Sequence, residues 1–420
     1  MTEKLTLQEL NRLVGKNGAI AVRRCARLLS AGGQDEKVFP ATYPESKGEV
    51  YLREQHIRPD GERIPCVVLD SVGSQANRME QALKEVFYHG QNEIADIPFI
   101  VADFSKAGNS IGNCFIPDIT SLDAPHRMAD AIFRDCLLNQ VPFPKSPVGE
   151  TLNTAAASNA TDLYKYCPTA LIFGMWFSQG ERGGLGAKFQ RIISSEITGV
   201  NVEVGVENAN RVDPLPIVKD AGPLYVKSDG SGWTLDEEAA RKTKQGKPES
   251  VGKEGKPSEV MLGNVIGEFK DRGFTMEYAV QNTVISIPAL KRLHFPDDEG
   301  EIKPDRDQAA WAALLALAIA GAQFSIDNGC DLRSRCLLIP DCEHPASWEW
   351  IGRDGKSHEF ETEDLESLVK EASKEAAERG LPAWNEKPIV LQPSPELYAL
   401  VKKSVEISAK SKEGDDSLEE

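Results

Sequence analysis

Aromatic residues and long apolar runs are scarce in this 420-residue chain. Phe, Trp and Tyr make up 7% of the residues, and the longest nearly uninterrupted apolar stretch, residues 309–322, is too short to span a bilayer. It predicts a core helix. The first residues, MTEKLTLQELNRLVGKNG, carry charges throughout and lack the apolar run of a secretory signal. We therefore expect a cytoplasmic protein with no membrane partner.

Signatures of metal chemistry are also missing. The zinc-protease pattern HExxH does not occur. The eight cysteines are scattered along the chain, as expected for buried, reduced thiols in a cytoplasmic protein. Cys330, Cys336 and Cys342 are separated by five residues each, with His344 two positions further on, whereas paired zinc ligands are usually separated by two to four. We expect no metal, no cofactor and no catalytic residue.

The charge is strongly negative and unevenly distributed. A formal net charge of −17 argues against a simple polyanion binder, because Lys and Arg neutralise phosphate. However, residues 354–420 hold 17 acidic and nine basic side chains, so much of the excess lies near the C-terminus. Residues 241–256 are locally basic, rich in Gly, Pro and Ser, and free of aromatics. This composition is typical of a flexible basic loop.

Apolar periodicity predicts strands alternating with helices, and so an α/β or α+β fold with a sheet. The predicted elements are strands at residues 18–29, 65–70, 168–176 and 274–280, and helices at residues 71–90, 125–138, 188–199 and 309–322. In the helix at 71–90, the apolar side chains share one face, which leaves Gln75 and Arg78 on another.

One glycine-rich stretch suggests phosphate binding. The sequence ERGGLGAKFQRIISSEITG, residues 181–199, has Gly183, Gly184 and Gly186 just before Lys188 and Arg191. Glycines let a backbone approach an anion, and a helix N-terminus offers unpaired N–H groups. The spacing fits neither a P-loop nor a dinucleotide fingerprint. The alternative is an ordinary tight turn before a helix.

Several motifs recur in this order in one protein family. They are VFPATY (38–43), LDSVGSQANRMEQAL (69–83), APHRMADAIFRD (124–135), PTALIFGMW (168–176), GGLGAKFQRIISSEITG (183–199), NRVDPL (210–215), PSEVMLGNV (257–265), SIPALKRLHFP (286–296) and DLRSRCLLIP (331–340). Together they make the chain resemble the RAMP-superfamily backbone subunit of the type I-G (formerly I-U) CRISPR Cascade complex, over roughly residues 18–340. The region after Pro340 and the 227–256 insertion match poorly.

The resemblance implies an α+β fold with an RRM-like, ferredoxin-like βαββαβ core and large insertions, including a thumb. Residues 1–350 would form this core, with 227–259 as a flexible basic loop. Residues 351–420 would form an acidic, helical extension with a disordered end. The resemblance also implies a non-catalytic protein that polymerises along guide RNA (crRNA) as a helical filament. Such a protein leaves the bases free to pair with target DNA in antiviral defence. Other Cascade subunits and, indirectly, the helicase-nuclease would be further partners.

By the same resemblance, the guide backbone would be held by the side chains and glycines of two segments. We predict contacts from Ser74, Gln75, Asn77, Arg78, Gly183, Gly184, Gly186, Lys188 and Arg191, with Arg127, Arg333 and Arg335 as further candidates that could instead brace the fold.

Two alternatives remain open at the level of sequence. The first is a RAMP endoribonuclease that processes repeat RNA or cleaves the target, with Asp103, Asp118 and His126 as candidate catalytic residues. The second is an unrelated nucleotide-binding enzyme that uses the glycine stretch, which the failed spacings disfavour.

Overall fold

A computed structural model describes residues 3–43, 50–105, 116–177, 188–208, 210, 212–264, 267 and 269–414. The chain divides into two compact units. The first comprises residues 1–105, 117–203 and 274–394, and the second comprises residues 106–116, 204–273 and 395–420. Residues 351–394 belong to the first unit.

The first unit is built on a large, mixed sheet, which has ten strands within the described residues. Its order from one edge is β1 (Glu3–Lys4), β18 (Ser357–Glu361), β17 (Trp348–Ile351), β2 (Ala21–Ser30), β14 (Phe269–Ser286), β11 (Ile193–Asn208), β4 (Arg63–Asp70) and β3 (Arg53–Ile57). A hairpin of β15 (Cys330–Arg333) and β16 (Cys336–Pro340) joins the sheet where β16 pairs antiparallel with β2. The model is thus mixed α and β, compatible with the α+β class.

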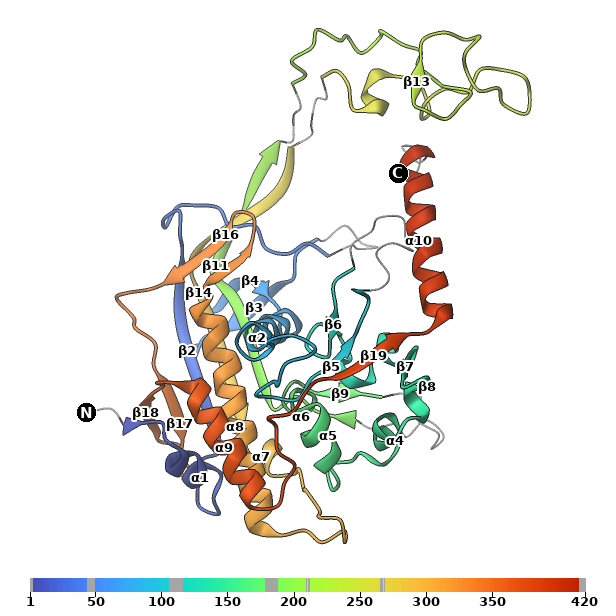
Figure 1. The fold of residues 1–420 in the computed structure, drawn as a ribbon. Coiled ribbons are helices and arrows are strands. Elements are labelled where there is room, and N and C mark those ends of the chain that lie inside the picture. The colour runs from blue at the N-terminus through green and yellow to red at the C-terminus, as the bar shows by residue number, and fades with distance from the viewer. Residues whose placement is uncertain are drawn as a thin grey trace. The chain divides into compact units, whose positions relative to one another are not determined.

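Helices pack on one face of this sheet (Figure 1). They are α1 (Leu7–Val14), α2 (Val72–Phe87), α7 (Ile287–Leu290), α8 (Pro304–Asp327) and α9 (Leu365–Glu378). Helix α2 begins at Ser71, whose hydroxyl accepts a hydrogen bond from the backbone N–H of Ser74. A Cβ on Gly321 of α8 would lie 3.1 Å from Leu83 Cδ1. The glycine therefore lets α8 approach α2 closely.

Helix α8 is the most apolar element and lies in the core. Among the described residues, it alone is long and apolar enough to cross a membrane, but 72% of its apolar window is buried inside the protein. Its 24 residues extend beyond the predicted range of 309–322 at both ends. The prediction of a core helix is confirmed.

A second sheet contributes the rest of the first unit. Its order is β6 (Ile119–Thr120), β5 (Ile100–Ala102), β19 (Ile389–Pro393), β7 (Cys136–Leu138) and β8 (Val141–Pro142). Between residues 127 and 189 the chain also forms η2 (Arg127–Ala129), α3 (Ala131–Arg134), η3 (Phe143–Lys145), α4 (Pro147–Thr154), α5 (Thr161–Tyr166), α6 (Pro168–Phe173) and a small hairpin of β9 (Met175–Trp176) and β10 (Lys188–Phe189).

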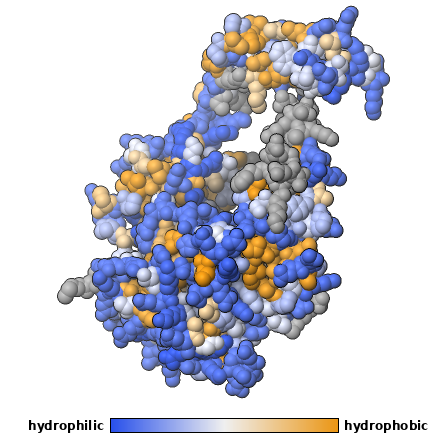
Figure 2. Space-filling model, in the orientation of Figure 1, coloured by the Kyte–Doolittle hydropathy of each residue, from blue (hydrophilic) through white to orange (hydrophobic). Residues whose placement is uncertain are grey.

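The second unit holds mainly turns and short elements between residues 204 and 273. They are β12 (Tyr225–Val226), β13 (Trp233–Thr234) and η4 (Pro257–Val260), while helix α10 (Pro395–Gly414) follows β19. Apolar side chains lie exposed on this unit (Figure 2), among them Val212, Leu215, Val218, Met261 and Phe269.

Two predicted elements have the wrong type. Residues 168–176 were expected to form a buried strand, but Pro168 begins helix α6, as proline at a first helical position favours. Residues 188–199 were expected to form a helix, but they form β10 and the start of β11. Short apolar runs fit both periodicities, and the β-branched residues of this stretch pack well in a sheet.

The helix predicted at residues 125–138 is also wrong. Arg127 has a left-handed backbone (φ 51°), which interrupts any continuous helix. Asp130 then caps the short helix α3, and Cys136 begins a strand. In contrast, the predicted strands at residues 18–29, 65–70 and 274–280 and the helix at 71–90 are confirmed as β2, β4, β14 and α2.

Candidate nucleic-acid interface

The start of α2 sits over a buried polar network. Gln75 is only 2% exposed, so the prediction that it lies off the buried face is wrong. Its amide Nε2 donates to Asp70 Oδ2 (2.6 Å), and its Oε1 accepts from Ser195 Oγ (2.9 Å) and Gln281 Nε2 (2.9 Å). Ser195 also bonds Thr283. Gln75 therefore joins α2 to strands β4, β11 and β14.

Arg78, one turn further along α2, connects this network to the β15–β16 hairpin. Its Nε lies 3.0 Å from Asp70 Oδ2, and its two terminal nitrogens donate to the carbonyl oxygens of Asp331 (3.1 Å) and Leu332 (2.8 Å). The side chain is still 31% exposed. We call the set of Asp70, Arg78 and the two carbonyl groups the Arg78 clamp.

The hairpin that the Arg78 clamp holds carries two exposed arginines. Arg333 donates from a terminal nitrogen to the carbonyl oxygen of Pro40 (2.8 Å). The guanidinium of Arg335 lies over the ring of Phe39, 3.9 Å from its centroid. The structure thus brings together three motifs that lie far apart in the sequence, VFPATY, LDSVGSQANRMEQAL and DLRSRCLLIP.

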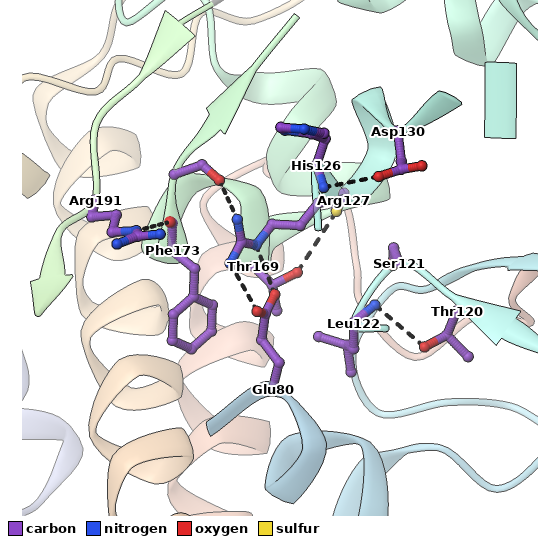
Figure 3. A network of polar contacts seen from close by, with 12 residues as sticks. Glu80, Thr120, Ser121, Leu122, His126, Arg127, Asp130, Thr169, Phe173 and Arg191 are labelled. Atoms are coloured by element: carbon purple, nitrogen blue, oxygen red, sulfur yellow. Dashed lines mark hydrogen bonds and ion pairs between the residues drawn. The ribbon is translucent and has the colours of Figure 1, made fainter. Parts of the chain in front are cut away.

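Arg127 lies in a second, buried cluster (Figure 3). Its Nε and one terminal nitrogen donate to the two carboxylate oxygens of Glu80 (2.7 and 2.8 Å), and the other terminal nitrogen donates to the carbonyl oxygen of Gly174 (2.7 Å). Arg127 is 5% exposed and Glu80 is 2% exposed. Burial raises the pKa of Glu80 to about 7, although the charge of Arg127 opposes the rise. This geometry braces α2 against the 126–129 turn.

The predicted glycine-rich site is described only at its C-terminal end. Gly183, Gly184 and Gly186 lie outside the described residues. Lys188 is exposed on β10. Arg191 donates from Nε to the carbonyl oxygen of Phe173 (3.2 Å), which ties it to the end of α6 (Figure 3).

The two remaining predicted contacts lie near the beginning of α2. Asn77 is exposed and Ser74 is half-buried, within one turn of the Arg78 clamp. The predicted residues therefore fall into an exposed group (Asn77, Lys188, Arg191, Arg333, Arg335), a half-buried group (Ser74, Arg78) and a buried group (Gln75, Arg127).

Two of the three candidate nuclease residues lie near Tyr88. Burial, together with the charges of Asp118, Asp123 and Asp103 in that order, raises the pKa of Tyr88 to about 12. Burial also raises the pKa of Asp103, but hydrogen bonds from Ser105 and Gln392 outweigh it and leave that pKa lowered. His126 is exposed, and its backbone N–H donates to Asp130.

The described residues contain no group of three or more His, Cys, Asp or Glu side chains that could hold a metal ion. The cysteines considered for zinc differ in exposure, with Cys336 buried, Cys330 half-buried and Cys342 exposed. His344 instead contacts Asp341, 2.9 Å from Oδ2.

Sequence reasoning missed the residues that hold the predicted arginines. Glu80, Asp70 and Phe39 were not singled out, because each acquires its role only through contact with an element distant in the chain. One hydrolase motif that the sequence reasoning took to be absent is present. Residues 108–112 read Gly-Asn-Ser-Ile-Gly, the G-x-S-x-G spacing of some hydrolases, and they fall outside the described residues.

The arrangement defines a mixed α and β protein whose β15–β16 hairpin exposes two arginines and whose described residues hold no candidate metal centre. Residues 22–204, a little under half of the chain, match the family CRISPR-associated protein GSU0053 (Cas_GSU0053). This match supports the CRISPR-associated part of the resemblance over these residues and suggests a role in CRISPR defence. It covers β2, β4, α2, the Arg127 cluster and most of β11. No curated protein matches the chain.

Proposed function

We propose that the chain is the guide-RNA-binding backbone subunit of a type I-G Cascade complex, a cytoplasmic, non-catalytic protein of the RAMP superfamily. Successive copies coat one crRNA and present it for pairing with target DNA, alongside other Cascade subunits and a helicase-nuclease. In this division of labour, the protein holds the RNA backbone and base pairing reads the sequence.

The strand order supports an RRM-like core. In chain order, the elements β2, α2, β11, β14, α8 and β16 follow the βαββαβ pattern. In the sheet, these strands lie in the order β16-β2-β14-β11, so the fourth strand flanks the first and the third separates the first from the second. This is the ferredoxin-like order, with β3 and β4 inserted before α2.

The face of this sheet also suits a protein that leaves bases unstacked. RRM domains stack bases on aromatic side chains of their sheet. Tyr278 on the middle strand β14 instead has the guanidinium of Arg27 over its ring, 4.0 Å from the centroid. Arg27 is in turn held by Asp341 (2.9 Å).

The observation that carries the proposal is the meeting of three family-like motifs around the start of α2. Motifs shared within a family often meet at a functional site, and here the meeting place exposes Arg333, Arg335 and Asn77. Arginines on one surface are the electrostatic feature expected of a phosphate-binding protein, even when the net charge is negative.

Exposed apolar residues support assembly with other chains. Val212, Val218, Met261 and Phe269 of the second unit are 66–81% exposed. Exposed apolar patches commonly mark contacts with another protein. We propose that the 204–273 segment is the thumb and that it contacts a neighbouring copy. Head-to-tail interfaces do not close on themselves, so repeated contacts of this kind build a filament.

The proposal is tested by co-producing the chain with a guide RNA and measuring the ratio of absorbance at 260 and 280 nm together with the apparent size. We expect large particles that contain RNA. A nucleic-acid-free monomer would count against the backbone role.

One observation favours the alternative of a RAMP endoribonuclease. Asp118 Oδ1 and the Tyr88 hydroxyl are buried without a hydrogen-bond partner among the described residues, in the neighbourhood of Asp103. Polar atoms of this kind are sometimes functional. Metal-dependent RNA cleavage that is abolished by Asp118→Ala or Asp103→Ala would establish this activity.

A further inference from the structure

The turn between β15 and β16 contains an unusual arginine. Ser334 and Arg335 form the two-residue turn, and Arg335 has a left-handed backbone with φ 63°. This region suits Gly or Asn and costs other residues roughly 1–2 kcal/mol. Strained non-glycine residues of this kind cluster at functional sites. The strained backbone therefore indicates that the Arg335 side chain has a function of its own.

The arginine side chain is held against an aromatic ring. The guanidinium lies 3.9 Å from the centroid of the Phe39 ring, and the backbone N–H of Phe39 donates to the carbonyl oxygen of Arg335 (3.0 Å). The ammonium of Lys37 lies 6.0 Å from the same ring. Two cations therefore share one aromatic side chain at the surface. A guanidinium oriented in advance loses less freedom when it binds a phosphate.

Arg78 is held by directed hydrogen bonds. All three of its guanidinium nitrogens have partners within the protein, namely Asp70 and the carbonyl oxygens of Asp331 and Leu332. Those carbonyl groups belong to β15, three and four residues before Arg335. A side chain whose donors are used in this way sets the position of the hairpin.

We propose that Arg335, together with Lys37 and Phe39, binds a backbone phosphate of single-stranded RNA, and that Arg78 is a positioning residue that holds the hairpin in place. The inference rests on the proposed function and assigns different roles to Arg335 and Arg78. The Arg335 guanidinium supplies charge-assisted hydrogen bonds to phosphate oxygens, and the Phe39 ring keeps it oriented.

Arg335→Gly separates binding from folding. Glycine relieves the left-handed strain, so the variant should melt at the same temperature as the native protein or higher. It should bind a fluorescent single-stranded guide RNA about tenfold more weakly, with a salt slope lower by about one. Lys356→Ala is the matched control, because it removes an equally positive, 77% exposed side chain away from the hairpin. It should leave affinity and slope unchanged.

Arg78→Lys tests the positioning role. Lysine keeps the charge but cannot reproduce three directed hydrogen bonds. If Arg78 positions the hairpin, Arg78→Lys should weaken binding in the native protein and add little in the Arg335→Gly background, because both changes disable one site. If Arg78 itself contacts phosphate, Lys should largely preserve binding, and the effects of the two changes should add.

The outcomes distinguish this inference from the proposed function. A folded Arg335→Gly variant that binds RNA with native affinity and native salt slope overturns the assignment of Arg335, while RNA binding by the native chain stands. Additive effects overturn the positioning role of Arg78. A native chain that does not bind the RNA at any salt concentration removes the proposed function and the inference together.

Discussion

Two arginine motifs of this chain look alike in sequence and differ in the structure. The PHR motif places Arg127 against Glu80, where it is 5% exposed and paired through both carboxylate oxygens. The LRSR motif places Arg333 and Arg335 on an exposed turn, against a carbonyl group and an aromatic ring. The difference shows that the burial and the contacts of an arginine depend on which distant element packs against it.

The largest effect should follow loss of the buried pair. Arg127→Met leaves the carboxyl group of Glu80 and the carbonyl group of Gly174 buried without their partner, and we expect a loss of about 3–5 kcal/mol in the free energy of unfolding. Denaturant unfolding measures this loss. The double variant Glu80→Met, Arg127→Met should recover much of it, because replacing both partners removes the unpaired group. A single variant as stable as the native protein would contradict the bracing role.

The buried pair should also make stability depend on pH. Burial raises the pKa of Glu80 in the folded protein to about 7, above the ordinary value of 4.5, and the charge of Arg127 opposes the rise. The contribution of Glu80 is therefore complete below pH 4.5 and is lost as pH rises through about 7, by an amount on the order of 1–3 kcal/mol. Unfolding of the native protein and of Glu80→Gln should be compared across this range. Parallel curves for the two proteins would show that Glu80 does not titrate there.

The polar network at the start of α2 should have an intermediate effect. Gln75→Leu leaves Gln281 without its amide acceptor and removes one donor from Asp70, so we expect a loss of about 1–3 kcal/mol in the free energy of unfolding. RNA affinity should fall only if the substitution changes the position of the first turn of helix α2. Ser74→Ala is the control, since its backbone N–H still bonds the Ser71 hydroxyl. Equal stability of Gln75→Leu and Ser74→Ala would contradict the importance of the network.

The smallest effect on folding is expected at the exposed end of the glycine-rich stretch. Lys188→Ala should leave the melting temperature unchanged and lower the salt slope of RNA binding by about one. Arg191→Ala should also cost stability, because Arg191 bonds the carbonyl oxygen of Phe173. An unchanged slope in Lys188→Ala would remove this lysine from the interface.

The sequence predicted the elements with long, clear periodicity. Helices α2 and α8 and strands β2, β4 and β14 all follow from apolar patterns that their own residues display. Residues 168–176 and 188–199 were assigned the wrong type, because their short apolar runs fit either period and the surrounding sheet decides. The left-handed Arg127, which splits the helix predicted at 125–138, carries no local signal such as glycine.

The candidate site was only partly predictable for the same reason. Arg78, Arg333 and Arg335 were identified from motifs, and the structure brings them to one hairpin. Their different uses depend on Asp70, Phe39 and Pro40, which reach them from separate parts of the chain. Sequence spacing cannot show such contacts. It also cannot show the strain at Arg335, which is visible only in the backbone of the structure.

The most direct test of the backbone role is the number of protein copies bound to guide RNAs of increasing length, measured as particle mass. A protein that coats the guide should add copies in steps as the RNA lengthens, and the RNA should be recovered intact. A single copy bound at every length, or RNA recovered as shorter fragments, would contradict the account.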